Sequence, residues 1–217
     1  MNSPVVAVID TGVGNLFSLA RAIEEVDGAV VITPVPEELS EADLVIIPGV
    51  GSFASTMSLF VKTGMAVALR NYAQQGRPLL GICLGMQLLA SVGLENGRTL
   101  GLGLIQGEAC PLPELTNEGA PIRIPHIGWS RVETVQGSAA NGWSGMRSTS
   151  ADLYFAHSFM VRTADPAALR ATISYGGHEI AAIIEQDNVT GVQFHPEKSG
   201  ILGLEFLRNF VFGVGQQ

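Results

Sequence analysis

Short runs of wholly apolar residues alternate with helix-length segments over the first half of the chain. The expected strands are residues 5–9, 30–33, 44–47 and 79–82, and the expected helices are 16–26, 66–74 and 84–92. A strand without polar alternation is covered on both faces, which is typical of a parallel sheet between layers of helices. The alternation therefore predicts an α/β fold with a parallel core.

Closely spaced strand-like runs and one closing helix follow after about Gly101. The expected strands are 121–124, 129–134, 153–155, 159–162, 169–174, 180–186 and 189–194, and the helix is 201–211. Turn signals at 175–178 and 186–188 predict antiparallel hairpins. We therefore expect a mixed central sheet with a parallel core flanked by helices and antiparallel strands in the C-terminal half. Residues 136–150, rich in Gly, Ser, Ala and Asn, are predicted to be a mobile surface loop.

Size and charge limit what the chain can do. Its 217 residues are 47% hydrophobic, enough for one buried core, so we expect a single domain over residues 1–217. A net charge of -8 without a basic, aromatic-rich run argues against nucleic acid as a partner. With no basic leader and no apolar run near the roughly 20 residues of a membrane span, we expect a cytoplasmic protein without a membrane partner.

Cys83 stands in the sharpest local motif, Gly81-Ile82-Cys83-Leu84-Gly85, between an expected strand and an expected helix. This is the pattern of a nucleophile elbow with cysteine in the place of serine. Glycine fits on both sides because the turn crowds its neighbours, and a helix N-terminus favours the thiolate, which attacks carbonyl carbons. A free cysteine is as often a small buried hydrophobe, which is what we expect of Cys110. Disulfides are rare in a reducing compartment, so at least one thiol is free.

The second motif is Phe194-His195-Pro196-Glu197, at the end of an expected strand. Pro196 biases His195 toward extended backbone, in which residues two apart point to the same side. Glu197 can then fix the imidazole tautomer while the other ring nitrogen faces the thiol. An isolated pair of this kind is usually an ordinary surface pair, but its occurrence with the elbow in one sheet favours a catalytic role.

A glycine-rich loop, Pro48-Gly49-Val50-Gly51, follows the expected strand 44–47. Loops at the carboxyl ends of strands form the ligand crevice of an open α/β sheet, and glycine lets a backbone N–H turn toward a substrate oxygen. This loop could supply one oxyanion donor and the amide of Leu84 the other. Taken alone, the motif is more simply an ordinary strand-to-helix turn.

Two other patterns carry less weight. Gly12-Val13-Gly14 resembles the opening of a dinucleotide loop, but Phe17 stands where the third glycine belongs, and no Walker-type lysine follows. The four histidines lack the spacing of a helix-borne metal motif. We predict neither a metal nor a cofactor.

The elbow, extended to Gln87, together with the His-Pro-Glu motif resembles the class I glutamine amidotransferases, whose Cys-His-Glu triad hydrolyses the side-chain amide of glutamine. Within this class the chain is similar to the glutaminase subunits of imidazole glycerol phosphate synthase, an enzyme of histidine biosynthesis. The similar segments are residues 10–16, 48–53, 125–129, 154–158 and 195–199. They occur in this order along the chain, and the matches run from Asp10 to the last helix, so the resemblance extends over nearly the whole chain.

The resemblance implies a role for each matching residue. Cys83 attacks the amide of L-glutamine, His195 protonates the departing ammonia, and Glu197 orients the imidazole. Gly51 and Leu84 line the oxyanion hole, and the amino-acid end of glutamine is held by Gln87, Glu95, Ser158 and Phe159. The residues implied to face a partner are Asn15, Pro125, His126, Trp129, Tyr154 and Lys198. That partner is a cyclase subunit, a TIM-type barrel in a heterodimer with this chain, which uses the ammonia to make imidazole glycerol phosphate and AICAR.

The chain departs from the family pattern at Thr11, Ser130 and Phe159, where Tyr, Asn and Tyr are common. These positions bear on the interface and the pocket rather than on the triad. Two alternatives stay open: a glutaminase that feeds another synthase, such as a pyridoxal phosphate or anthranilate system, and a non-catalytic module on the same scaffold. Segments 125–129 and 154–158 argue against the first, and the intact triad argues against the second.

Overall fold

The computed structural model describes residues 3–14, 16–135 and 150–213. Asn15 and residues 136–149 of the expected surface loop lie outside the described residues.

A nine-stranded mixed sheet forms the centre of the fold, in the order β2-β1-β3-β4-β13-β12-β11-β8-β9. The strands of the parallel part are β1 (Val5–Ile9), β2 (Ala29–Thr33), β3 (Leu44–Ile47), β4 (Leu79–Ile82) and β13 (Val189–Val192). The antiparallel strands are β12 (His178–Gln186), β11 (Leu169–Tyr175), β8 (His126–Thr134) and β9 (Ser150–His157). The expected α/β fold with a mixed sheet is confirmed.

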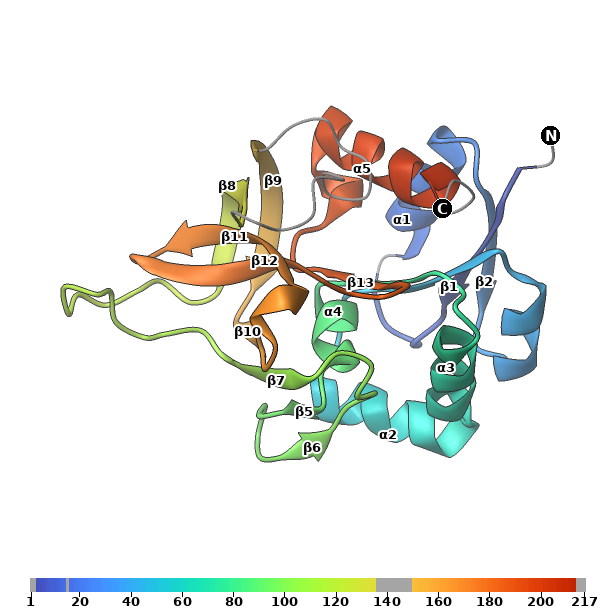
Figure 1. The fold of residues 1–217 in the computed structure, drawn as a ribbon, viewed down its shortest axis with the longest axis horizontal. Coiled ribbons are helices and arrows are strands. Elements are labelled where there is room, and N and C mark those ends of the chain that lie inside the picture. Colours follow the sequence, from blue (N-terminus) through green and yellow to red (C-terminus); the bar gives the residue numbers. More distant parts are fainter. Residues whose placement is uncertain (1–2, 15, 136–149, 214–217) are drawn as a thin grey trace.

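Helices cover both faces of the parallel part (Figure 1). On one side lie α1 (Leu16–Glu25) and α5 (Gly200–Gly213), and on the other lie α2 (Phe53–Thr63), α3 (Met65–Gln74) and α4 (Leu84–Leu89). Along β1 the side chains alternate between the layers: Val6 and Val8 pack in the cluster that includes Phe206 of α5, whereas Ala7 and Ile9 pack with Phe60 of α2. Side chains on both faces of β1 are therefore buried against helices, which explains why residues 5–9 are apolar throughout.

A smaller four-stranded sheet, in the order β10-β7-β5-β6, lies on the α2 and α4 side (Figure 1). Its strands are β10 (Phe159–Thr163), β7 (Gly107–Pro111), β5 (Val92–Gly93) and β6 (Thr99–Leu100). The helix expected over 84–92 ends at Leu89 because the chain turns into β5, where Gly93 lies against Phe53: a Cβ there would be 2.5 Å from the ring.

The strand expected over 121–124 is wrong, because only an isolated bridge joins Leu115 to Pro121. The segment 115–124 instead bonds to the end of β11 and to the β11–β12 turn. The Asn117 side chain donates to the Gly177 carbonyl at 2.6 Å, and the Tyr175 hydroxyl donates to the Arg123 carbonyl at 2.6 Å. Proline also lacks the N–H that a ladder needs. The Asn117 N–H also donates to the Gly176 carbonyl at 3.2 Å, so these contacts hold the segment without strand pairing.

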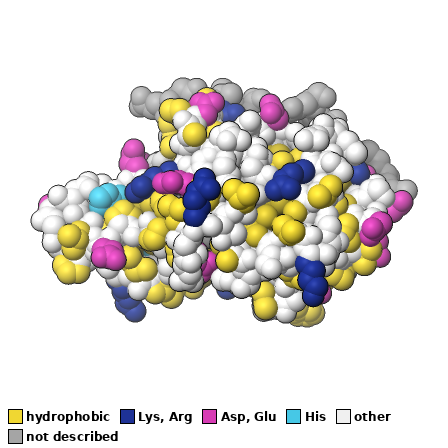
Figure 2. Space-filling model, turned by 90° about the horizontal axis from the view of Figure 1, so that it is seen from below, with side chains coloured by type: hydrophobic (Ala, Val, Ile, Leu, Met, Phe, Trp, Pro, Cys, Tyr) yellow, Lys and Arg dark blue, Asp and Glu magenta, His cyan; other side chains and the backbone are white. Residues whose placement is uncertain are grey.

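Three short 3-10 helices complete the described elements: Pro36–Glu41, Pro166–Ala168 and Pro196–Lys198. Figure 2, seen from below relative to Figure 1, shows hydrophobic side chains mixed with charged ones on that face. No helix in the described ranges is long and apolar enough to cross a membrane.

Candidate active site

Cys83 and His195 are brought together by two neighbouring parallel strands. Ile82, the last residue of β4, pairs with Val192, the last residue of β13, so both strands end at the same edge of the sheet. The Cys83 N–H donates to the Val192 carbonyl at 2.7 Å and continues this ladder. The chain beyond each strand end therefore enters one crevice, as expected at the carboxyl edge of an open sheet.

Both glycines of the elbow are required by close backbone approaches. A Cβ on Gly81 would lie 2.5 Å from the carbonyl carbon of Gly85, and one on Gly85 would lie 2.1 Å from the Ile47 carbonyl oxygen. Cys83 itself has φ 51° and ψ -106°, a conformation that is costly for a residue with a side chain. Such strain is typical of a nucleophile elbow.

His195 and Glu197 form a buried pair. Nδ1 of His195 lies 2.9 Å from Oε1 of Glu197, and the two side chains are 6% and 9% exposed. Burial of the imidazole lowers the pKa of His195, but hydrogen bonds to the Cys83 and Glu197 side chains, with their negative charges, outweigh it and raise that pKa to about 9. At neutral pH the ring is thus an imidazolium between a carboxylate and the sulfur.

The Cys83 sulfur has two further polar neighbours. Sγ lies 3.8 Å from the Ala156 carbonyl oxygen and 3.5 Å from Nε2 of Gln193. Gln193 is fully buried, and its Oε1 lies 3.3 Å from Nε2 of Gln87. No motif in the sequence assigns a role to Gln193, although a glutamine between the apolar residues Val192 and Phe194 is itself a signal, since buried polar groups need partners.

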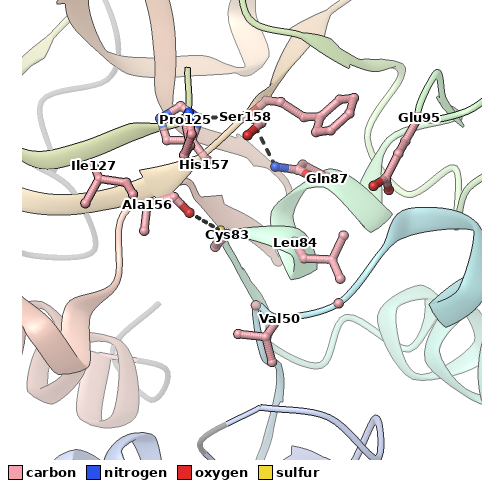
Figure 3. Close-up of a pocket in the computed structure, with 13 residues that line it drawn as sticks. Val50, Cys83, Leu84, Gln87, Glu95, Pro125, Ile127, Ala156, His157 and Ser158 are labelled. Carbon is pink, nitrogen blue, oxygen red and sulfur yellow. Dashed lines mark hydrogen bonds between the residues drawn. The ribbon is translucent and has the colours of Figure 1, made fainter. Parts of the chain in front are cut away.

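A cavity of about 340 Å³ opens above the sulfur (Figure 3). Most of the residues predicted for catalysis and glutamine binding line it: Gly51, Cys83, Leu84, Gln87, Glu95, Ser158 and Phe159. Pro125, predicted to face the partner, lines it too. In Figure 3, Cys83 lies beneath Ala156, and the amide of Gln87 points toward the Ser158–Phe159 segment, where it bonds to the Phe159 carbonyl. Leu84 and Val50 lie below Gln87 in this view. His195 and Glu197 are not among the lining residues, so the cavity meets the triad only through the sulfur.

The Pro48–Gly51 loop packs directly against the nucleophile. A Cβ on Gly49 would lie 2.6 Å from the Cβ of Cys83 and 2.3 Å from the Ile82 carbonyl oxygen. Gly51 has φ +119°, which favours glycine, and its position lies beside Leu84. Val50 packs against Gly14, where an added Cβ would be only 1.8 Å from Cγ2 of Val50. This contact accounts for the glycine at position 14 without any nucleotide.

Glu95 has a structural contact as well as a place in the cavity wall. Its Oε2 accepts a hydrogen bond of 2.6 Å from the N–H of Phe53, at the first residue of α2. A carboxylate is favourable at a helix N-terminus. Among the described residues the other oxygen has no hydrogen-bond partner, so it can bind a ligand or solvent.

The residues implied to face a partner divide into two groups. Trp129, 58% exposed, lies opposite Tyr154 on the β8–β9 pair, with ring centroids 6.0 Å apart, and Nζ of Lys198 lies 5.9 Å from the Tyr154 ring. Pro125 is exposed at the cavity. His126, in contrast, is only 4% exposed, and its ring nitrogens lie 3.0 Å from Nε2 of His157 and 2.9 Å from Oγ of Ser130.

The fold and the crevice with its cysteine elbow define a class of protein. The chain belongs to the class-I glutamine amidotransferases, since the model of the family Glutamine amidotransferase class-I matches residues 7–214. A chain of PurLQS from Thermotoga maritima shares the fold, with a TM-score of 0.73 at 18% identity, covering 98% of this chain and 97% of that one.

Within that class the chain belongs with the HisH proteins. It is 40% identical over 207 residues to the imidazole glycerol phosphate synthase subunit HisH of Geobacillus thermodenitrificans, covering 95% of each chain. The HisH subunit of Moorella thermoacetica is 42% identical over 206 residues, which cover 94% of this chain and 93% of that one. The HisH 1 subunit of Legionella pneumophila strain Lens is 40% identical over 210 residues, covering 95% and 98%.

Proposed function

We propose that the chain is the glutaminase subunit of an imidazole glycerol phosphate synthase. It hydrolyses the side-chain amide of L-glutamine and supplies the ammonia to a cyclase subunit in histidine biosynthesis. The observation that carries this proposal is the meeting of Cys83 with the buried His195–Glu197 pair beneath one cavity, in a chain about 40% identical to HisH proteins. Residues 1–217 act as a single glutamine amidotransferase domain.

Acylation begins with the deprotonated sulfur. The Cys83 thiolate attacks the amide carbon of glutamine, a C–S bond forms, and the carbonyl electron pair becomes an oxyanion. Backbone N–H groups of Gly51 and Leu84 stabilise that oxyanion. When it collapses, the C–N bond breaks, and the His195 imidazolium gives its proton to the leaving nitrogen, which departs as ammonia.

Deacylation restores the starting state. The neutral His195 takes a proton from water, the resulting hydroxide attacks the thioester carbonyl, and the C–S bond breaks. The new γ-carboxylic acid gives its proton to solvent and leaves as glutamate, and the thiolate and imidazolium are present again. Glu197 stays ionised throughout and holds the ring by its 2.9 Å hydrogen bond to Nδ1.

The cavity walls suit the amino-acid end of glutamine. Nε2 of Gln87 already donates to Oε1 of Gln193 and to the Phe159 carbonyl, both at 3.3 Å, which uses both of its hydrogens. Oε1 of Gln87 is therefore the atom that can accept from the α-ammonium of the substrate. The carboxylate of Glu95 attracts the same cation, and backbone groups near Ser158 and Phe159 complete the pocket.

The partner is a cyclase subunit, a TIM-type barrel that forms a cytoplasmic heterodimer with this chain. It approaches the rim that carries Pro125, Trp129, Tyr154 and Lys198. Ile127, an apolar side chain that is 63% exposed between Pro125 and Trp129, supports a protein interface at this rim.

A comparison of nitrogen sources tests this division of labour. Cys83→Ala, assembled with a cyclase subunit, should lose glutamine-dependent synthesis of imidazole glycerol phosphate and keep synthesis from free ammonium. Cys110→Ala is the matched control, because Cys110 is also buried but does not line the cavity, and it should retain both activities. Equal loss with both nitrogen sources in Cys83→Ala would contradict the proposal.

A further inference from the structure

Gln193 is a fully buried polar side chain that has no role in the reaction steps proposed above. Its amide lies between the Cys83 sulfur and the amide of Gln87. A buried primary amide needs both acceptors and donors around it, so its partners define what it does. Which end of the amide faces the sulfur decides whether the sulfur meets a donor or an acceptor.

The orientation of this amide is fixed by a backbone carbonyl. The Phe159 carbonyl oxygen can only accept, so the amide end of Gln87 that lies 3.3 Å from it is the NH₂ group. The same NH₂ group faces Gln193 at 3.3 Å, so Gln193 must present its carbonyl oxygen there. The NH₂ group of Gln193 is then left facing Sγ of Cys83 at 3.5 Å.

The same carbonyl also fixes two histidines. Nδ1 of His157 lies 2.8 Å from the Phe159 oxygen and must carry a hydrogen, so its Nε2 accepts from Nδ1 of His126 at 3.0 Å. Nε2 of His126 in turn accepts from the Ser130 hydroxyl at 2.9 Å. Burial lowers the pKa of His157 to about 4, which keeps the ring neutral as this order requires. The Phe159 carbonyl that orients Gln87 is therefore itself fixed by a hydrogen bond from His157.

We propose that Gln193 is a further catalytic residue, whose side-chain N–H donates to the Cys83 sulfur and stabilises the thiolate over the thiol. The inference rests on the proposed function, in which the thiolate attacks glutamine. Two other polar groups face the sulfur: the His195 imidazolium also favours the thiolate, whereas the Ala156 carbonyl at 3.8 Å accepts only from the thiol S–H. Gln193 thus favours the thiolate, the reactive form of the sulfur. It does so most effectively when Gln87 is in place to hold the orientation of its amide.

Alkylation of Cys83 measures this stabilisation without using glutamine. In the full chain, the rate at which iodoacetamide labels the Cys83 peptide is followed by mass spectrometry from pH 5 to 10, because the thiolate is the reacting form. Gln193→Met keeps the size of the side chain and removes the donor, and it should raise the pH of half-maximal labelling by about one unit, as expected for losing a hydrogen bond to a charged group. Gln186→Met, an exposed site on the neighbouring strand, is the control and should not shift it.

The inference is overturned if Gln193→Met keeps the thermal stability of the parent chain and labels with the same pH profile. If Gln193→Met does not fold, Gln87→Met takes its place: it frees the Gln193 amide to rotate and should give a smaller upward shift, and no shift there overturns the inference equally. Failure of the proposed function would give a different experimental result. It would appear as no glutamate from glutamine with the partner present, while the labelling shift persists.

Discussion

One carboxylate oxygen of Glu197 lies 2.9 Å from Nδ1 of His195, whereas the other is buried without a hydrogen-bond partner among the described residues. A buried carboxylate with an unpaired oxygen is costly unless a charge compensates it. The imidazolium is that charge, so each group stabilises the ionised state of the other.

Replacing Glu197 by Gln should reduce glutaminase turnover less than replacing His195 by Ala. The neutral amide can still accept from Nδ1, but it no longer stabilises the imidazolium, so we expect a loss of about 10²-fold, against up to about 10⁴-fold for the missing acid and base. Steady-state glutamate release in the presence of the cyclase subunit measures both. Unchanged turnover in Glu197→Gln would remove Glu197 from the triad.

Glutamine hydrolysis should fall as the pH rises through about 9. His195 acts first as an acid, and its pKa is raised to about 9, so the acid form is present at neutral pH and is lost above that value. The descending limb of kcat/KM against pH reports this ionisation in the free enzyme. In Glu197→Gln the limb should move to lower pH, because a charge that favours the imidazolium is gone. A limb centred near 6.5 in the parent chain would contradict the assignment.

Gly49→Ala should disable the nucleophile without unfolding the chain. The added Cβ would lie 2.6 Å from the Cβ of Cys83 and 2.3 Å from a carbonyl oxygen, so the loop or the elbow must move. A misplacement of about 1 Å can cost about 10²-fold in rate. Gly213→Ala, where a Cβ meets nothing within 4 Å, is the control. Full glutaminase activity in Gly49→Ala would show that the loop can shift without moving Cys83.

Gly51→Pro tests whether the Val50–Gly51 peptide is an oxyanion donor that the partner turns into place. Proline removes the N–H and cannot adopt φ +119°, so activation by the cyclase and its substrate should be lost. The expected loss is about 10²–10³-fold in glutamine hydrolysis, with ammonium-dependent synthesis kept. Partner-stimulated hydrolysis at the parent rate would place the donor elsewhere.

The neutral His157 should make the fold sensitive to acid. Its pKa is about 4 in the folded chain and 6.5 ordinarily, so between these values the unfolded state binds more protons, and stability falls as the pH drops from about 6.5 to 4. The full shift corresponds to about 3 kcal/mol at the acid end. Urea unfolding of His157→Gln, which can make both neighbouring hydrogen bonds, should lack this part of the pH dependence. Parallel curves for the two proteins would argue against it.

The strands of the parallel core could be predicted from the sequence because their neighbours on both faces are apolar. Strands Val5–Ile9, Leu44–Ile47 and Leu79–Ile82 have the predicted bounds. The helix Phe53–Thr63 was missed, although its signals are present: Ser52 caps it by accepting from the Ser55 N–H, and Gly64 ends it at φ 81°. Strands of two residues, such as Val92–Gly93, are too short to show a period.

The directions of the side chains in the site could not be predicted from the sequence motifs alone. The motif Pro125–Trp129 suggests one partner-facing segment, yet in a strand His126 and Trp129 point to opposite faces, and His126 is buried while Trp129 is exposed. The elbow and the His-Pro-Glu pair are local and could be recognised from spacing. The contact of Gln193 with Gln87 joins distant segments, and no spacing in the sequence predicts it.

The position of β13 between β4 and β12 has a consequence for how the chain is made. Synthesis proceeds from the N-terminus, so Cys83 leaves the ribosome long before the strand that carries His195. Until that strand inserts, β4 is an open edge, and the cysteine has no base and no carboxylate behind it. A nascent or truncated chain that lacks β13 therefore has no catalytic triad, and it should not hydrolyse glutamine until that strand is in place.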